Sequence, residues 1–147
     1  MNSTRIVPLL RRAESREDAL AKLLATKVQA HQQQAERLGD LQRFRGEYEQ
    51  AAAPGAALTP GLLQNRTAFL AKIDDAVQTQ KKHVSSSEEA LSIERTRLLL
   101  ASRDKLVLEK LAASYRCAEQ RVEDRRAQSV QDDLGARAHT IRNKDST

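Results

Sequence analysis

Few residues of this sequence could carry out chemistry, and their spacing argues against catalysis. His31, His83 and His139 lie too far apart for the i, i+4 pair that binds a metal ion on one face of a helix. Adjacent acidic residues point to different sides of a helix, so they predict solvated faces rather than an acid–base pair. Cys117 is the single cysteine, and there is no glycine-rich phosphate-binding loop. We therefore expect no enzyme, no metal site, no cofactor and no small-molecule substrate.

The composition favours long helices over a compact globule. Of the 147 residues, 39% are hydrophobic, 31% are charged and only 3% are aromatic. Ala, Leu, Glu, Gln, Lys and Arg dominate, which is typical of a long helix or a coiled coil. The net charge of +5 is small beside 25 basic and 20 acidic residues, so it does not demand a nucleic-acid partner. The single cysteine, and the absence of an apolar run of about 18 residues, predict a cytoplasmic protein.

Three of the four aromatic residues form a cluster of large apolar side chains. Phe44 and Tyr48 precede a break at Pro54, and Phe69 follows it. Folding the chain at this break brings Tyr48 level with Phe69, and Phe44 level with Ile73. The cluster either holds the closed end of the fold together or forms a docking patch, because aromatic residues are enriched at binding hot spots. The residues alone leave both interpretations open.

The element that precedes the break is predicted as a helix over about residues 8–52. Pro8 suits the first turn of a helix. From Leu20 on, apolar or small residues recur about every 3.5 residues, the period of a left-handed coiled coil. These positions are Leu20, Leu24, Val28, His31, Ala35, Leu38, Leu41, Phe44 and Tyr48. The polar residues His31, Lys27 and Gln34 weaken the middle of this stripe.

A connection of residues 53–59 leads to a second predicted helix over about residues 60–134. Thr59 and Pro60 combine an N-cap with a proline at the first helical position. The apolar seam comprises Ile73, Val77, Val84, Leu91, Leu98, Ala101, Leu108, Ala112, Tyr115 and Val122, and it is diluted by Gln80, Ser87, Glu94, Lys105 and Glu119. A capping box in Ser85–Glu89 leaves open whether the helix breaks at residues 83–88. Gly135 is expected to end the helix and leave a flexible tail of residues 135–147.

Two helices joined by one short connection fold back antiparallel. The predicted fold is therefore all-α, a single antiparallel two-helix coiled-coil hairpin whose longer second helix overhangs. We expect the segment after about Leu111 to have no partner within the chain. It still carries Tyr115 and Val122 among arginines, which indicates an external partner.

The sequence resembles the family of the bacterial flagellar export protein FliJ. The resemblance rests on the hairpin of a shorter and a longer helix and on two segments, Leu41-Gln-Arg-Phe-Arg-Gly-Glu-Tyr48 and Leu63-Gln-Asn-Arg-Thr-Ala-Phe-Leu-Ala-Lys-Ile-Asp-Asp-Ala-Val77. Its most specific part is the Leu-Gln-Asn-x-x-x-Phe-Leu opening of the second helix.

The resemblance implies a stalk-like component of the flagellar type III export apparatus. Such a protein links the hexameric export ATPase to the cytoplasmic linker of the membrane export gate, contacts export chaperones, and is needed for flagellum assembly, motility and chemotaxis. It would be cytoplasmic and peripherally associated with the inner membrane at the flagellar base. Carried over by position, the gate patch is Leu41, Phe44, Tyr48, Phe69, Ile73, Ala76 and Gln80. The overhang supplies the candidate ATPase contacts Tyr115, Arg121, Val122, Arg125 and Arg126.

Two other functions remain as alternatives. The stalk protein of a virulence type III secretion system shares the same architecture. A nucleic-acid-associated hairpin would use the basic excess, but acids such as Glu119, Glu123 and Asp124 interrupt the basic residues. Because tracking of phosphates needs clustered cations, we expect no nucleic-acid partner.

Overall fold

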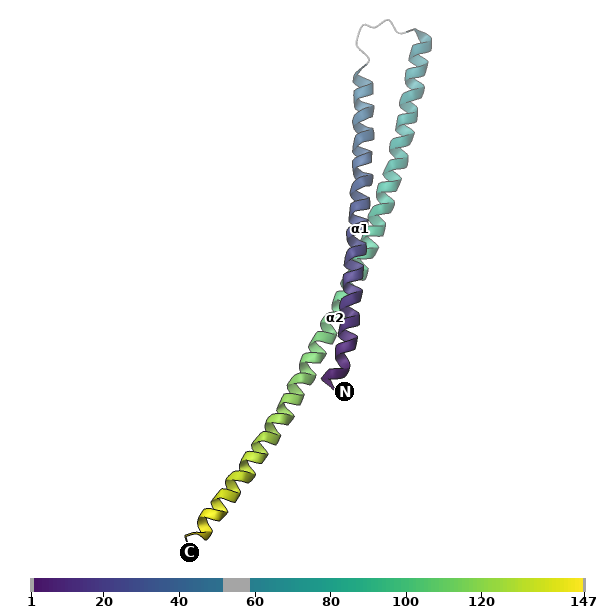
Figure 1. Cartoon of the computed structure of the whole chain (residues 1–147). Helices are drawn as coiled ribbons and strands as arrows, with labels where there is room; N and C mark the ends of the chain where they lie inside the picture. The colour runs from purple at the N-terminus through teal and green to yellow at the C-terminus, as the bar shows by residue number, and fades with distance from the viewer. Residues whose placement is uncertain (1, 52–58, 147) are drawn as a thin grey trace. The chain divides into compact units, whose positions relative to one another are not determined.

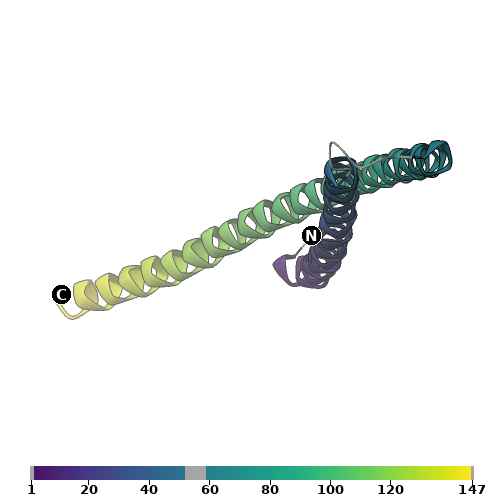
Figure 2. The ribbon, with the colours of Figure 1, turned by 90° about the horizontal axis from the view of Figure 1, so that it is seen from above.

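A computed structural model describes residues 2–51 and 59–146 of the chain. Its two helices are α1, Ser3–Gln50, and α2, Pro60–Lys144 (Figure 1). Each is one uninterrupted helix, and Figure 2 shows the long run of turns of α2 from above. No strand occurs in these two described ranges, so the predicted all-α helical hairpin with a longer second helix is confirmed. Of the expected connection at 53–59, only Thr59 lies within the described residues.

The chain divides into two compact units, each built from a part of α1 and a part of α2. Unit 1 comprises Met1–Arg16 and Ala101–Thr147, and unit 2 comprises Glu17–Leu100. The two units differ in the side chains that fill the contact between α1 and α2 within each unit.

The first helix begins earlier than the sequence predicted, at Ser3 rather than near Pro8. The Ser3 N–H would lack a partner at a helix N-terminus, but it donates a hydrogen bond to Glu119 Oε1 of α2 (2.9 Å). The Ser3 hydroxyl donates to Glu119 Oε2 (2.6 Å). The side chain of Ile6, one turn later, is completely buried. This cap and this burial stabilise the turn that precedes Pro8.

The second helix begins as predicted but ends later. Thr59 Oγ1 accepts a hydrogen bond from the Leu62 N–H (3.3 Å), which confirms Thr59 as the N-cap. The expected end at Gly135 is wrong, because Gly135 does not adopt the positive φ of a helix C-cap and the helix continues to Lys144. No break occurs at residues 83–88, where the Ser87 hydroxyl donates to the carbonyl of Val84 (2.8 Å) within the helix.

The seam predicted for α2 is confirmed from Ile73 to Tyr115, where all its members are buried or half-buried. Val122 departs from it, with 46% of its surface exposed. In α1, Gln34 and Arg45 are half-buried where Ala35 and Phe44 were expected. Both replacements have polar partners on α2, which explains why a polar side chain occupies the seam there.

Unit 2 contains apolar and polar levels along the same pair of helices. Its buried apolar side chains are Ile73, Val77 and Leu91. Between them, Gln80 Nε2 donates to the carbonyl oxygen of Gln34 (2.9 Å) and to its side-chain Oε1 (2.8 Å). His31 Nδ1 and Ser87 Oγ lie 2.8 Å apart at the next level. Because each of these buried polar groups has a partner, they stabilise one alignment of the helices.

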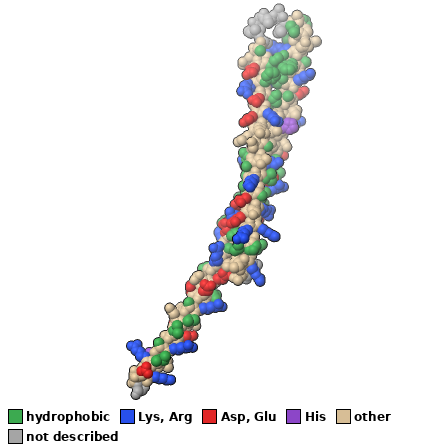
Figure 3. Space-filling view, in the orientation of Figure 1, with side chains coloured by type: hydrophobic (Ala, Val, Ile, Leu, Met, Phe, Trp, Pro, Cys, Tyr) green, Lys and Arg blue, Asp and Glu red, His purple; other side chains and the backbone are tan. Residues whose placement is uncertain are grey.

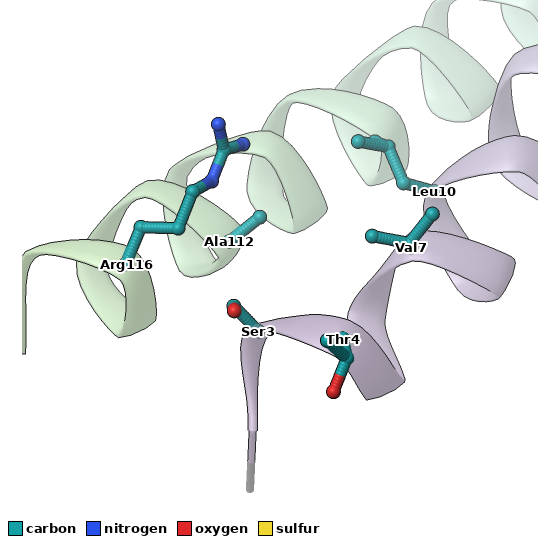
Figure 4. A pocket seen from close by; sticks show the side chains of 6 residues that line it. All are labelled: Ser3, Thr4, Val7, Leu10, Ala112 and Arg116. Carbon is teal, nitrogen blue, oxygen red and sulfur yellow. The ribbon is translucent and has the colours of Figure 1, made fainter. Parts of the chain in front are cut away.

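In unit 1, small side chains allow the beginning of α1 to lie against α2. Ala101 and Ala112 are almost fully buried. Figure 4 shows Val7 and Leu10 of α1 facing Ala112 across a shallow groove, with Ser3 at the start of the helix. The contact reaches Glu119 rather than stopping near Leu111 as expected, because α1 begins at Ser3. Beyond it, every described residue from 120 to 146 is exposed.

Candidate docking surface at the aromatic end of unit 2

The end of unit 2 next to the undescribed segment carries the largest apolar side chains of the predicted gate patch. The ring of Tyr48 lies 4.6 Å from that of Phe69, centroid to centroid, at an interplanar angle of 54°. The ring of Phe44 lies 6.3 Å from that of Phe69 at 78°, an edge-to-face contact. We call Phe44, Tyr48 and Phe69 the aromatic cluster. Figure 3 shows hydrophobic side chains gathered here, beside the grey segment.

The aromatic cluster is accessible as well as packed. Phe44 exposes 48% of its surface and Phe69 exposes 38%, whereas Tyr48 is half-buried. Phenyl rings that pack across two helices and remain partly exposed form an apolar surface whose contact with water is unfavourable. Phe69 contacts two rings of α1 and still presents part of its own ring to solvent, which is the geometry that each of the two interpretations of the sequence requires.

The other members of the predicted patch divide into surface and interior. Leu41 is half-buried and Ala76 is exposed. Ile73 and Gln80 are buried, with 6% and 9% of their surface exposed. Both side chains are used between the helices, Ile73 in apolar packing and Gln80 in its hydrogen bonds with Gln34. Of the predicted patch, the aromatic cluster, Leu41 and Ala76 thus keep accessible surface, whereas Ile73 and Gln80 are enclosed between the helices.

Polar contacts that the sequence analysis did not identify frame the aromatic cluster. The guanidinium of Arg45 donates hydrogen bonds to Asp74 on α2 and to Glu49 one turn along α1 (3.1 Å). These contacts, that with Asp74 first, raise the pKa of Arg45 above its ordinary value. Arg66 Nη2 donates to the carbonyl of Glu49 (2.8 Å). These polar contacts could have been predicted from the sequence. An alignment of the helices that sets Tyr48 opposite Phe69 also brings the residues next to them on α1 and α2 close together.

The second predicted set, the candidate ATPase contacts, lies in unit 1. Tyr115 is half-buried, whereas Arg121, Val122, Arg125 and Arg126 are exposed. The last four belong to the stretch 120–146, in which every described residue is exposed, and Val122 and Arg126 line a groove that also includes Asn2. Tyr115 thus lies in the paired part of α2 and the others lie beyond it.

Within residues 2–51 and 59–146, no group of three or more His, Cys, Asp or Glu side chains could hold a metal ion. In the same ranges, neither helix has a window apolar enough to cross a bilayer. Cys117 is exposed and is not part of a disulfide.

The family model described as Flagellar FliJ protein matches residues 1–144 of the chain. No curated protein and no solved structure matched the chain. The family match covers both helices and both candidate contact sets.

Proposed function

Because the chain belongs to the FliJ family and is thus a component of the flagellar export apparatus, we propose that it is the non-enzymatic stalk of that apparatus. In this role it links the hexameric export ATPase to the cytoplasmic linker of the membrane export gate and contacts export chaperones. Flagellum assembly and motility would then depend on it. It would be held peripherally at the inner membrane through the gate. The family match favours this flagellar role over the virulence alternative.

The observation that carries the proposal is the exposure of Phe44 and Phe69 in a cluster that the helices hold rigid. Binding hot spots are often aromatic side chains that the partner covers completely. The gate linker would cover the aromatic cluster together with Leu41 and Ala76. Ile73 and Gln80 would act as positioning residues, because neither is available to a partner.

The test of the gate contact is a set of single substitutions in the full-length chain. Phe44→Ala should weaken binding of the isolated gate linker by about tenfold or more, which corresponds to a hot spot of over 1 kcal/mol. Val107→Ala is the matched control, because Val107 is 63% exposed and lies outside the patch. Helix content measured by circular dichroism should be the same in both variants. Equal affinity of the Phe44→Ala and Val107→Ala proteins for the linker would contradict the docking role.

The test of the ATPase contact uses the exposed end of α2. Removal of residues 120–147 leaves the Ser3–Glu119 hydrogen bonds and every buried side chain of the described residues in place. We expect the shortened chain to bind the gate linker normally and to lose stimulation of the export ATPase. Full stimulation by the shortened chain would contradict an ATPase contact at Arg121, Val122, Arg125 and Arg126.

A further inference from the structure

The net charge of the chain is concentrated in one unit. Residues 17–100, which form unit 2, hold 11 basic and 11 acidic residues. The whole excess of +5 therefore lies in unit 1, which holds 14 basic and 9 acidic residues. The first 16 residues contribute most to it, with four arginines and a single acid, Glu14.

Three of these arginines share one face of α1 with an exposed leucine. Arg5, Leu9, Arg12 and Arg16 follow the spacing i, i+4, i+7, i+11, which places them along one side of a helix. We call them the arginine stripe. All three arginines are exposed, and Leu9 exposes 44% of its surface. No salt bridge involves these arginines among the described residues.

An apolar groove lies beside two of the stripe's arginines, within unit 1. Arg12, Ala13 and Arg16 of α1 line it together with Ala101, Asp104 and Leu108 of α2, and its volume is about 330 Å³. Asp104 is the one acid of the lining, and it forms no salt bridge with either arginine. Two cations at the rim of an apolar groove suit a ligand that joins a negative group to hydrocarbon.

We propose that the arginine stripe binds the surface of a bilayer that contains anionic phospholipid. The phosphates would bind Arg5, Arg12 and Arg16, while Leu9 and the groove beside Arg12 would contact the upper part of the acyl chains. A helix with basic residues and exposed apolar side chains on one face is the usual form of such a contact. The stripe carries no aromatic side chain for stacking on bases, so nucleic acid is the weaker fit. This contact is separate from the aromatic cluster and does not depend on the stalk role.

The experiment is co-sedimentation of the full-length chain with vesicles. Vesicles of phosphatidylcholine alone are compared with vesicles in which about a third of the lipid is phosphatidylglycerol. We expect binding to the anionic vesicles only, and its loss when the salt concentration rises to about 0.5 M, because screening removes the attraction to phosphates. Absence of binding to anionic vesicles at low salt, or equal binding to both kinds, would overturn the proposal.

Two triple variants that lose the same charge distinguish an effect of the arginine stripe from an effect of net charge. Arg5→Gln/Arg12→Gln/Arg16→Gln should lower the partition coefficient onto anionic vesicles by about a hundredfold, at about fivefold for each arginine. Lys81→Gln/Lys82→Gln/Arg95→Gln removes the same charge from exposed positions of unit 2 and should lower it by less than about threefold. Similar losses in the two variants would contradict a specific stripe.

A third variant tests the apolar part, and a competitor tests the choice of ligand. Leu9→Asn should reduce partitioning several-fold without changing its dependence on salt, because the charges remain. Circular dichroism checks that all variants keep the helix content of the parent chain. Duplex DNA at the same phosphate concentration should not displace the chain from anionic vesicles. If the DNA does displace it, the stripe is a nucleic-acid contact and the lipid assignment is wrong.

Discussion

Two levels of the helix pair in unit 2 hold α1 and α2 together in different ways. At the aromatic cluster, α1 and α2 are joined by large apolar rings that remain partly exposed. Nearer the middle, Gln34 and Gln80 are joined by hydrogen bonds between side chains and backbone. Apolar contact is strong but tolerates small shifts, whereas a buried hydrogen bond requires one geometry. Within one seam, the apolar level therefore contributes most to the strength of helix association, and the polar level fixes how the two helices are aligned.

The largest expected effect comes from a buried apolar side chain below the aromatic cluster. Ile73→Ala should lower the free energy of unfolding by about 2–5 kcal/mol, because it leaves a cavity between the helices. Phe44→Ala should cost about 1 kcal/mol or less, since nearly half of that ring is already in water. Urea unfolding followed by circular dichroism measures both. A larger cost for Phe44 than for Ile73 would show that Phe44 belongs to the core.

The polar level should respond to the removal of one partner more than to the removal of both. Gln80→Ala leaves the Gln34 side chain without its partner, which we expect to cost about 1–3 kcal/mol. The double variant Gln34→Leu/Gln80→Leu should recover that loss, because two apolar side chains replace a matched polar pair. The same urea titration provides the comparison. If the double variant is less stable than Gln80→Ala, the hydrogen bonds contribute more to stability than to alignment.

A third level of the seam in unit 2 contains a buried carboxylate, that of Glu94, with a hydrogen-bond partner in the described chain for only one of its two oxygens. Glu94 exposes 6% of its surface, and its Oε1 accepts from Arg97 (3.0 Å) while its Oε2 has no partner among the described residues. Glu94→Leu should therefore raise the free energy of unfolding by about 1–3 kcal/mol. The remaining Arg97 side chain is 60% exposed and stays hydrated. A decrease in stability on this substitution would show that the ion pair of Glu94 with Arg97 stabilises the seam more than an apolar side chain does.

The smallest effect is expected at the start of α1 in unit 1. The Ser3 hydroxyl and the Ser3 N–H, in that order, lower the pKa of Glu119 below its ordinary value. A lowered pKa in the folded state means that the contribution of Glu119 is present above its unfolded pKa and is lost as the pH falls through the lowered one. The rate of amide exchange of residues 3–6 is therefore compared with that of amides in α2 at the same pH. We expect this ratio to be higher at about pH 3 than at pH 7. Glu119→Gln should make this comparison insensitive to pH, and a persistent pH effect in that variant would contradict the assignment.

The period of the apolar residues was enough to predict the fold. A repeat of 3.5 residues placed nearly every seam position from Ile73 to Tyr115, and the pairing of Tyr48 with Phe69 followed from a break at one place. The helix ends were predicted less well. Pro8 and Gly135 are ordinary end signals, and both were overridden, the first by a cap that Glu119 supplies from the other helix.

The candidate patch was predictable in outline but not in its division into surface and interior. Spacing places Phe44, Phe69, Ile73 and Gln80 at one end of the fold, but it does not determine which side chains face the opposite helix. The structure buries Ile73 and Gln80 and exposes Phe44, because Arg45 takes the seam position beside it and pairs with Asp74. Where polar residues interrupt an apolar stripe, the spacing does not determine which of two adjacent residues faces the opposite helix.

The end of α2 has a consequence for how it forms. Every described residue of the stretch 120–146 is exposed, so packing contributes little to its folding. Its i, i+4 contacts, such as that of Gln120 with Asp124 (3.0 Å), are individually weak. Nucleation is the costly step of the helix–coil transition, but this stretch adds turns to a helix that is already formed up to Glu119. It therefore propagates rather than nucleates, and it frays back turn by turn on warming without a cooperative midpoint of its own. The same residues as a free peptide would be largely coil.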